Sequence, residues 1–202
     1  MSFEHKKSLG QNFLNSDYVP KKMCDAADLS VGELVLEIGP GTGALTQEIL
    51  TRGGRVLALE ADERAITELQ QTFAPAISAG QLDLRHYDAR NINPEELGLG
   101  HGNYKVIANI PYYLSGLLFR KLLATTIQPN TLVFLIQKEV AERITRDTKE
   151  SLLSLSVKAF GKPRYVTTVK RTHFTPPPNV DSAIVAVDAI SRQHFATLDE
   201  AH

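Results

Sequence analysis

The chain has 202 residues, of which 43% are hydrophobic and 22% are charged, and its formal net charge is −1. This composition is typical of an ordinary globular protein, and the single cysteine, Cys24, excludes an internal disulfide framework. No run of about 18 apolar residues predicts a membrane span, and the N-terminus lacks the apolar segment of a signal peptide, so we expect a cytoplasmic protein.

Apolar runs and helical patterns alternate along the chain from residue 17 onward. Each predicted strand is rich in Val, Ile and Leu, and four predicted helices follow the capping residues Asp17, Asp62, Ser115 and Ser151. Strands are expected at 33–38, 55–60, 82–87, 104–109, 131–137, 164–170 and 182–188. Helices are expected at 18–29, 44–52, 63–73, 116–126, 138–145 and 152–161.

Buried strands separated by helices indicate an α/β fold with a doubly wound, mostly parallel, Rossmann-like sheet of seven strands. The last two strands are joined without a helix, so we expect an antiparallel edge there. Folds of this kind bind ligands beyond the carboxyl ends of their strands. The pattern fades after Asp188. We therefore expect one domain at 1–188, followed at 189–202 by a polar tail or the start of a missing C-terminal domain.

Three glycines follow the first predicted strand in the stretch "EIGPGTGALT". Gly39, Gly41 and Gly43 allow positive φ angles and a close approach of a ligand to the backbone. Their G-x-G-x-G spacing differs from the G-x-G-x-x-G of dinucleotide sites, where a pyrophosphate meets a helix N-terminus. Glu37 beside this loop would repel phosphate but suits a cationic ligand, such as a sulfonium that also carries an ammonium group. Taken alone, the glycine loop is weak evidence for the identity of the ligand.

Acidic residues stand at the ends of the next two strands. Glu60 follows Gly39 by 21 residues, a position where a carboxylate can bind both hydroxyls of a ribose. Asp88, just after the third strand, can accept a hydrogen bond from an adenine amino group. Together with Gly39 and Gly41, these residues predict S-adenosylmethionine rather than NAD as the cofactor, and no metal.

The fourth strand leads into the corner "NIPYYLS" at 109–115. The exocyclic amine of a base is a poor nucleophile, because its lone pair is delocalised into the ring. Asn109 and the carbonyl of Ile110 can accept its two N–H groups, while Pro111 fixes the turn and Tyr112 offers a stacking face worth roughly 1–3 kcal/mol. Catalysis would then come from positioning and polar stabilisation. The alternative is a turn whose tyrosine packs on the core.

A second aromatic residue, Phe174, precedes three consecutive prolines in "FTPPPNVDS". A stiff loop carrying Phe174 could close the other face of a stacked base. The alternative is a core phenylalanine before a proline-rich linker.

Charge is divided unevenly along the chain. Residues 25–100 hold five Lys/Arg against thirteen Asp/Glu, a balance of −8, whereas residues 105–171 hold twelve against four, a balance of +8. A basic face is the usual footprint of phosphate binding, and the alternative is a solvated surface with scattered charge.

Several motifs together resemble, in their order along the chain, the KsgA/RsmA family of ribosomal RNA adenine dimethyltransferases. Erm enzymes, which modify large-subunit rRNA, are close relatives with similar motifs, but "GQNFL" and "FTPPPNVDSA" look closer to the KsgA version. The matching segments are "SLGQNFL" (8–14), "LEIGPGTGALT" (36–46), "NIPYYLS" (109–115), "IQKEVAERI" (136–144) and "FTPPPNVDSA" (174–183).

The resemblance implies roles for individual residues. Asn12 and Leu14 would cover the cofactor from the N-terminal segment, and Asn109 would lie between the cofactor and the target base. The remaining implied contacts are Gly39 with the methionine part, Glu60 with the ribose, Asp88 with the adenine amine, and Tyr112 and Phe174 with the two faces of the target base.

The implied activity is the transfer of two methyl groups to the N6 amine of each of two adjacent adenosines near the 3′ end of small-subunit rRNA, during ribosome biogenesis. The implied partner is a late small-subunit assembly particle, and we expect a monomer without membrane contact. Two departures stand out: Tyr113 replaces an asparagine that is common in the bacterial pattern, and the chain stops near the expected start of the family's small helical domain.

Four alternatives remain open. The chain could be an Erm-type large-subunit rRNA methyltransferase, a DNA or small-RNA adenine methyltransferase, or a non-catalytic RNA-binding assembly or transcription factor on the same fold. The fourth alternative is a small-molecule methyltransferase, which is disfavoured because such an enzyme would not need the basic half of the chain.

Overall fold

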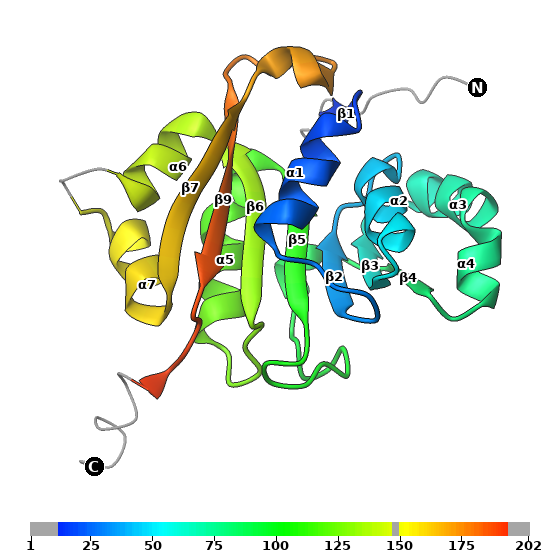
Figure 1. Ribbon diagram of the computed structural model, residues 1–202, viewed down its shortest axis with the longest axis horizontal. Coiled ribbons are helices and arrows are strands. Elements are labelled where there is room, and N and C mark those ends of the chain that lie inside the picture. The colour runs from blue at the N-terminus through cyan, green and yellow to red at the C-terminus, as the bar shows by residue number, and fades with distance from the viewer. Residues whose placement is uncertain (1–11, 147–149, 194–202) are drawn as a thin grey trace.

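A computed structural model describes residues 12–146 and 150–193 of the chain. A twisted central sheet carries helices on both faces, with α1 in front of the sheet and α5 behind it in the view of Figure 1. The motif residues 8–11 and most of the predicted tail, residues 194–202, lie outside the described residues.

The sheet has seven strands in the order β4-β3-β2-β5-β6-β9-β7. β2 to β6 are mutually parallel, whereas β9 runs antiparallel to both β6 and β7. The predicted doubly wound class is confirmed, and so is the antiparallel edge, where the edge strand β7 pairs antiparallel with β9. The strands are β2 (Leu34–Ile38), β3 (Arg55–Glu60), β4 (Leu82–His86), β5 (Lys105–Asn109), β6 (Thr131–Gln137), β7 (Lys162–Val169) and β9 (Ser182–Asp188).

Neighbouring side chains along the central strands enter two separate cores, one on each face of the sheet. Val106 and Ala108 belong to the core that includes side chains of α5, α6 and α7, while Ile107 between them belongs to the core that includes side chains of α1, α2 and α3. This alternation follows from the period of two along a strand. The helices are α1 (Tyr18–Ala26), α2 (Ala44–Thr51), α3 (Glu63–Thr72), α4 (Ala74–Ser78), α5 (Ser115–Ala124), α6 (Lys138–Thr145) and α7 (Leu152–Phe160).

Two of the four predicted caps are confirmed. The side chains of Asp62 and Ser151 accept hydrogen bonds from the backbone N–H groups that follow them. Asp17 stands before α1 but makes no capping bond, because its carboxylate pairs with Lys21 instead. Ser115 is also no cap: it is the first residue of α5, and its hydroxyl donates to a carbonyl of the preceding turn.

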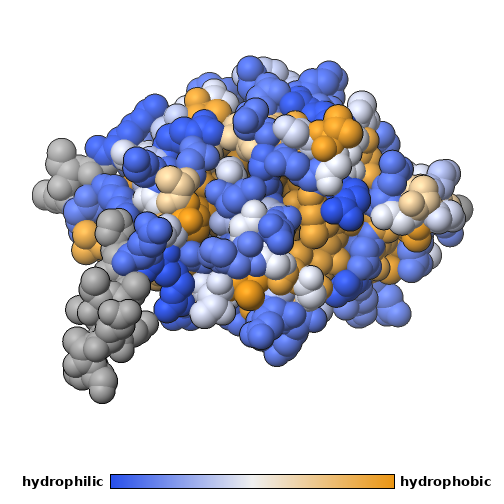
Figure 2. All heavy atoms as spheres, turned by 60° about the horizontal axis from the view of Figure 1, so that its bottom comes forward, coloured by the Kyte–Doolittle hydropathy of each residue, from blue (hydrophilic) through white to orange (hydrophobic). Residues whose placement is uncertain are grey.

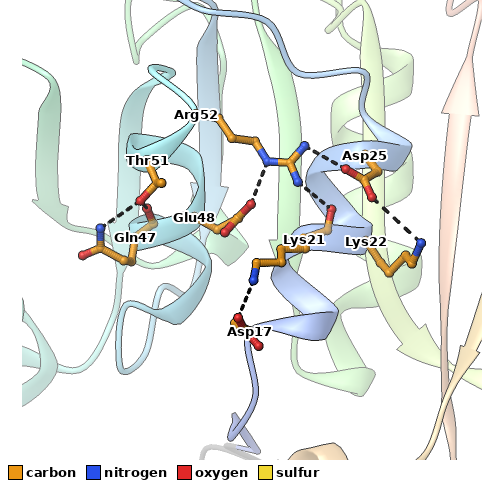
Figure 3. Close-up of polar contacts among 8 residues, drawn as sticks. All are labelled: Asp17, Lys21, Lys22, Asp25, Gln47, Glu48, Thr51 and Arg52. Atoms are coloured by element: carbon orange, nitrogen blue, oxygen red, sulfur yellow. Dashed lines mark hydrogen bonds and ion pairs between the residues drawn. The ribbon is translucent and has the colours of Figure 1, made fainter.

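The first helix ends at Ala26, three residues earlier than predicted, and Asp28 beyond it adopts a positive φ of 48°. A guanidinium group ties this helix to its neighbour (Figure 3). Arg52, at the end of α2, lies 2.8 Å from a carboxylate oxygen of Asp25 and 2.7 Å from one of Glu48. It also donates to the backbone carbonyl of Lys21 at 3.2 Å. These contacts hold α1 against α2.

Two very short strands form a second sheet that the sequence pattern did not predict. β1 (Phe13–Leu14) pairs antiparallel with β8 (Phe174–Thr175), so that Leu14 lies opposite Phe174. Two residues are too few to give a period, so only the tertiary structure creates this pairing. It brings segments about 160 residues apart to one end of the molecule (Figure 1).

The opposite end of the molecule, brought forward in Figure 2, carries hydrophilic side chains with hydrophobic ones between them. None of the described helices has the length and apolar character that crossing a membrane requires.

Candidate functional site

A cavity of about 410 Å³ opens at the carboxyl ends of β2, β3 and β5, beside the β1–β8 pair. This volume lies within the range of roughly 300–1,000 Å³ of small-molecule sites. Of the residues singled out from the sequence, Gly43 is not part of the lining, whereas the following ten line the cavity: Asn12, Leu14, Gly39, Gly41, Glu60, Asp88, Asn109, Pro111, Tyr112 and Phe174.

The glycine loop has the backbone that the sequence predicted. Gly39, Gly41 and Gly43 have φ angles of 69°, 58° and 83°. A Cβ atom at Gly41 would meet the ring of Phe13 at 2.9 Å, and one at Gly43 would meet the ring of Phe73 at 2.5 Å. The loop therefore needs glycine for two reasons, its backbone conformation and the close approach of aromatic rings.

Gly43→Ala is expected to lower the free energy of unfolding by about 2–4 kcal/mol, since it combines a left-handed alanine with overpacking against Phe73. Gly98→Ala is the matched control, because Gly98 has a φ of 78° but no atom within 4 Å of its Cβ position. The control should lose only about 1–2 kcal/mol. Urea unfolding measures both values, and equal losses would contradict the packing argument.

Glu60 is a buried carboxylate held by the backbone. One of its oxygens accepts hydrogen bonds from the N–H groups of Ala61 and Asp62, both at 2.9 Å, and the other accepts from Gly41 at 3.1 Å. The residue is 6% exposed. A carboxylate offers about four acceptor positions, so Glu60 keeps capacity for a ligand in the cavity that it lines.

Asp88 is held by a residue that the sequence analysis missed. The side chain of Arg90 donates to both carboxylate oxygens at 2.6–3.0 Å, and its backbone N–H donates at 2.9 Å. Hydrogen bonding to Arg90 lowers the pKa of Asp88 below its ordinary value. Asp88 is thus kept ionised as an acceptor, and the Asp-x-Arg spacing after a strand was the signal that could have revealed this partner.

Glu37, one of the residues that line the cavity, has a buried carboxyl group with incomplete hydrogen bonding. One carboxyl oxygen accepts from the hydroxyl of Thr46 at 2.7 Å, whereas the other is buried and has no hydrogen-bond partner among the described residues. Burial raises the pKa of Glu37 to about 8, against the opposing effect of the Thr46 hydrogen bond. A buried polar atom without a partner is costly, so this position suits a ligand that brings a donor or a positive charge.

The corner after β5 is fixed by hydrogen bonds at both ends. The Nδ2 atom of Asn109 donates to the backbone carbonyl of Asn12 at 3.1 Å, and within the described residues its side-chain oxygen has no partner. The Tyr112 hydroxyl shares a hydrogen bond of 2.8 Å with Ser182. Burial raises the pKa of Tyr112. The corner therefore presents an amide oxygen and a fixed aromatic ring to the cavity.

Phe174 combines features of both interpretations made from the sequence. It is 3% exposed and belongs to the core that also contains Val19 and Val169, as the core alternative expects. It also lines the cavity. Tyr113 differs from Tyr112 and Phe174 because it is 66% exposed at the cavity rim. Throughout the described part of the chain, no group of three His, Cys, Asp or Glu side chains could hold a metal ion.

Comparisons with known proteins give a consistent result. A family model described as ribosomal RNA adenine dimethylase matches residues 2–200. Ribosomal RNA small subunit methyltransferase A of Dehalococcoides mccartyi (strain CBDB1) is 42% identical over 183 residues, which cover 90% of this chain and 62% of that protein. The protein of the same name from Geobacillus sp. (strain WCH70) is 37% identical, with coverage of 98% and 70%.

Two solved structures extend the comparison. A dimethyladenosine transferase from Plasmodium falciparum is 32% identical with a TM-score of 0.77, and the match covers 93% of this chain and 67% of that one. The 23S rRNA methyltransferase ErmE is 24% identical with a TM-score of 0.78, covering 94% and 78%, and shows a shared fold.

Proposed function

The chain belongs to the ribosomal RNA adenine dimethylase family, and from this premise we propose that it is an S-adenosylmethionine-dependent rRNA adenine dimethyltransferase. Its substrates would be two adjacent adenosines near the 3′ end of small-subunit rRNA, each dimethylated at N6 in a cytoplasmic assembly particle. The chain spans 62% of the length of the Dehalococcoides relative, and we assign the methyltransferase domain to residues 1–188. The observation that carries the proposal is the gathering of Glu37, Glu60, Asp88 and Asn109 around one cavity.

The donor groups of the cavity fit the proposed cofactor. Glu60 would accept the ribose hydroxyls, and Asp88 would accept the adenine amino group. The unpaired oxygen of Glu37 suits an ammonium group, and the bare backbone of Gly39 leaves room for the methionine part. Asn12 and Leu14 would cover the ligand. When bound, S-adenosylmethionine supplies an electrophilic methyl group.

The corner residues would prepare the adenine amine. The side-chain oxygen of Asn109 and the carbonyl of Ile110 would accept its two N–H groups, which directs the nitrogen lone pair away from the ring. Tyr112, fixed through Ser182, and Phe174 would hold the base between them. None of the residues lining the cavity is a histidine or cysteine, so we assign the catalytic effect to positioning and polar stabilisation.

The affinity for S-adenosylmethionine, taken relative to that of a variant in which position 37 does not titrate, is expected to rise with pH up to about pH 8 and then level off. Burial raises the pKa of Glu37 to about 8, so below that pH the free protein carries a proton that must leave before the carboxylate can pair with an ammonium group. By linkage, the association constant then rises up to about tenfold per pH unit. Calorimetric titrations between pH 6 and 9 measure this profile.

Glu37→Gln is the matched control, because it keeps the size of the side chain and removes its titration. The ligand's own amino group, with a pKa of about 8, affects both proteins equally. The ratio of the two association constants should therefore change with pH, and parallel profiles would contradict a role for Glu37 in binding the ammonium group.

The cofactor and substrate assignments need separate tests. Calorimetry should show binding of S-adenosylmethionine and no binding of NAD, and the reverse preference would overturn the cofactor assignment. With labelled cofactor, unmethylated small subunits and large-subunit rRNA are then offered in parallel. Label only in the large-subunit RNA would overturn the small-subunit assignment in favour of an Erm-type activity.

A further inference from the structure

Three basic residues contact one aspartate, Asp181, whose neighbour in the chain, Ser182, is hydrogen-bonded to the cavity residue Tyr112. The carboxylate of Asp181 accepts hydrogen bonds from Nζ of Lys170 and from the backbone N–H of Arg171, both at 3.0 Å. The backbone carbonyl of Asp181 accepts from the N–H of Lys138, also at 3.0 Å. We call Lys138, Lys170 and Arg171 the rim cations.

The rim cations lie directly beside the proposed base-binding residues. Ser182, the next residue after Asp181, is fully buried and pairs in register with Gln137 of β6 and Val169 of β7. Neighbouring strands lie about 4.8 Å apart, so the residues that follow these two strand ends flank Ser182. The Ser182 hydroxyl is bonded to Tyr112, which links the rim cations to the aromatic wall of the cavity.

The charges at the rim are available to a ligand. The side chains of Lys138 and Lys170 are 43% and 70% exposed. Their ion pairs, Lys138 with Glu142 at 3.7 Å and Lys170 with Asp181 at 3.0 Å, are of the exposed kind that contributes little. Arg171 is exposed, and its guanidinium has no ion pair within the described ranges. Hydrogen bonds from Arg171 and Lys170 lower the pKa of Asp181, which keeps it ionised.

We propose that the rim cations bind the backbone phosphate next to the adenosine whose base enters the cavity. This inference rests on the proposed function and adds which residues position the RNA backbone beside the cavity. Asp181 holds the start of α6 and the segment after β7 together, so cations from two distant parts of the chain reach the same phosphate. Phosphate contacts of this kind fix register, whereas the cavity reads the base.

The test compares two triple variants of equal charge. The rim variant carries Lys138→Gln, Lys170→Gln and Arg171→Gln. The control variant carries Arg120→Gln, Lys158→Gln and Lys162→Gln. All three control side chains are exposed; Arg120 lies on α5, Lys158 on α7 and Lys162 at the other end of β7 from Val169. Binding of a short labelled single-stranded RNA with two adjacent adenosines is measured by anisotropy over a range of salt concentrations.

The rim variant should bind the RNA at least about tenfold more weakly at low salt. Its slope of log affinity against log salt should be shallower by about 0.7 for each phosphate that the variant no longer neutralises. The control variant should change the slope by less than half that amount. Equal changes in both variants, or no change in the rim variant, would overturn the inference. The single variant Arg171→Gln leaves both hydrogen bonds to the Asp181 carboxylate in place and should show a smaller change in the same direction.

Replacing one phosphate of the RNA by an uncharged linkage shows which phosphate the rim cations bind. An RNA with one methylphosphonate next to the adenosine pair should bind the wild type more weakly but leave the affinity of the rim variant almost unchanged, as expected for two changes to one contact. If the methylphosphonate weakened RNA binding by the same factor in the wild type and in the rim variant, the assignment would be overturned. Binding is measured without cofactor, so it is separable from the proposed function: absent methyl transfer with an intact rim effect would count against the enzyme activity alone.

Discussion

Asn109→Ala should abolish methyl transfer while leaving the affinity for S-adenosylmethionine within about tenfold. In the proposed mechanism the side-chain oxygen of Asn109 accepts an N–H of the adenine amine, and loss of one preoriented polar group of this type costs about 10²–10³ in kcat. Single-turnover methyl transfer gives the rate, and calorimetry gives the cofactor affinity. Unchanged turnover in the variant would remove Asn109 from the mechanism.

A second variant separates this role from a structural one, because Asn109 also donates to the backbone carbonyl of Asn12. Asn109→Asp keeps an acceptor oxygen but removes the donor to Asn12. It should retain more activity than Asn109→Ala if the acceptor matters most. Equal loss in both variants, with weaker cofactor binding, would instead assign Asn109 to holding the N-terminal segment.

Glu60→Ala should weaken the binding of S-adenosylmethionine by about 1.5–3 kcal/mol, the usual contribution of hydrogen bonds to a charged group. This corresponds to a loss of affinity of about tenfold to 150-fold. Calorimetry measures the change, and an unaltered dissociation constant would refute the assignment of Glu60 to the ribose.

The control for Glu60 must account for its backbone contacts, because its carboxylate also holds Gly41, Ala61 and Asp62. The free energy of unfolding is therefore measured for the same variant, and Glu60→Gln tests whether the negative charge itself is needed. Asp83→Asn removes one acidic charge from β4, outside the residues that line the cavity. It should leave cofactor binding unchanged.

The sequence was sufficient to predict the seven strands of the large sheet, because buried parallel strands are continuous apolar runs, and every described α-helix except α4. β3, β6, α6 and β9 were predicted with the observed bounds. The prediction was wrong for Asp17 and Ser115 as caps, because a capping residue can bond to a nearby side chain or carbonyl instead. Composition cannot tell which of these partners a short polar side chain will choose.

The gathering of residues around the cavity was predictable where those residues follow strand ends. Gly39, Glu60, Asp88 and Asn109 could be grouped because parallel strands place their carboxyl ends at one edge of the sheet. The hydrogen bond between Tyr112 and Ser182, and the pairing of Leu14 with Phe174, join residues far apart in the chain without a periodic signal. Such contacts depend on the folded arrangement of the strands.

The most direct test of the central claim is nucleoside analysis of unmethylated small ribosomal subunits after incubation with this chain and S-adenosylmethionine. The proposed function predicts N6,N6-dimethyladenosine at two adjacent positions near the 3′ end of the rRNA, absent when the Asn109→Ala variant is used. A complete lack of methylated adenosine, with S-adenosylmethionine still bound, would contradict the assignment of this cavity as an rRNA methylation site in the chain as it stands.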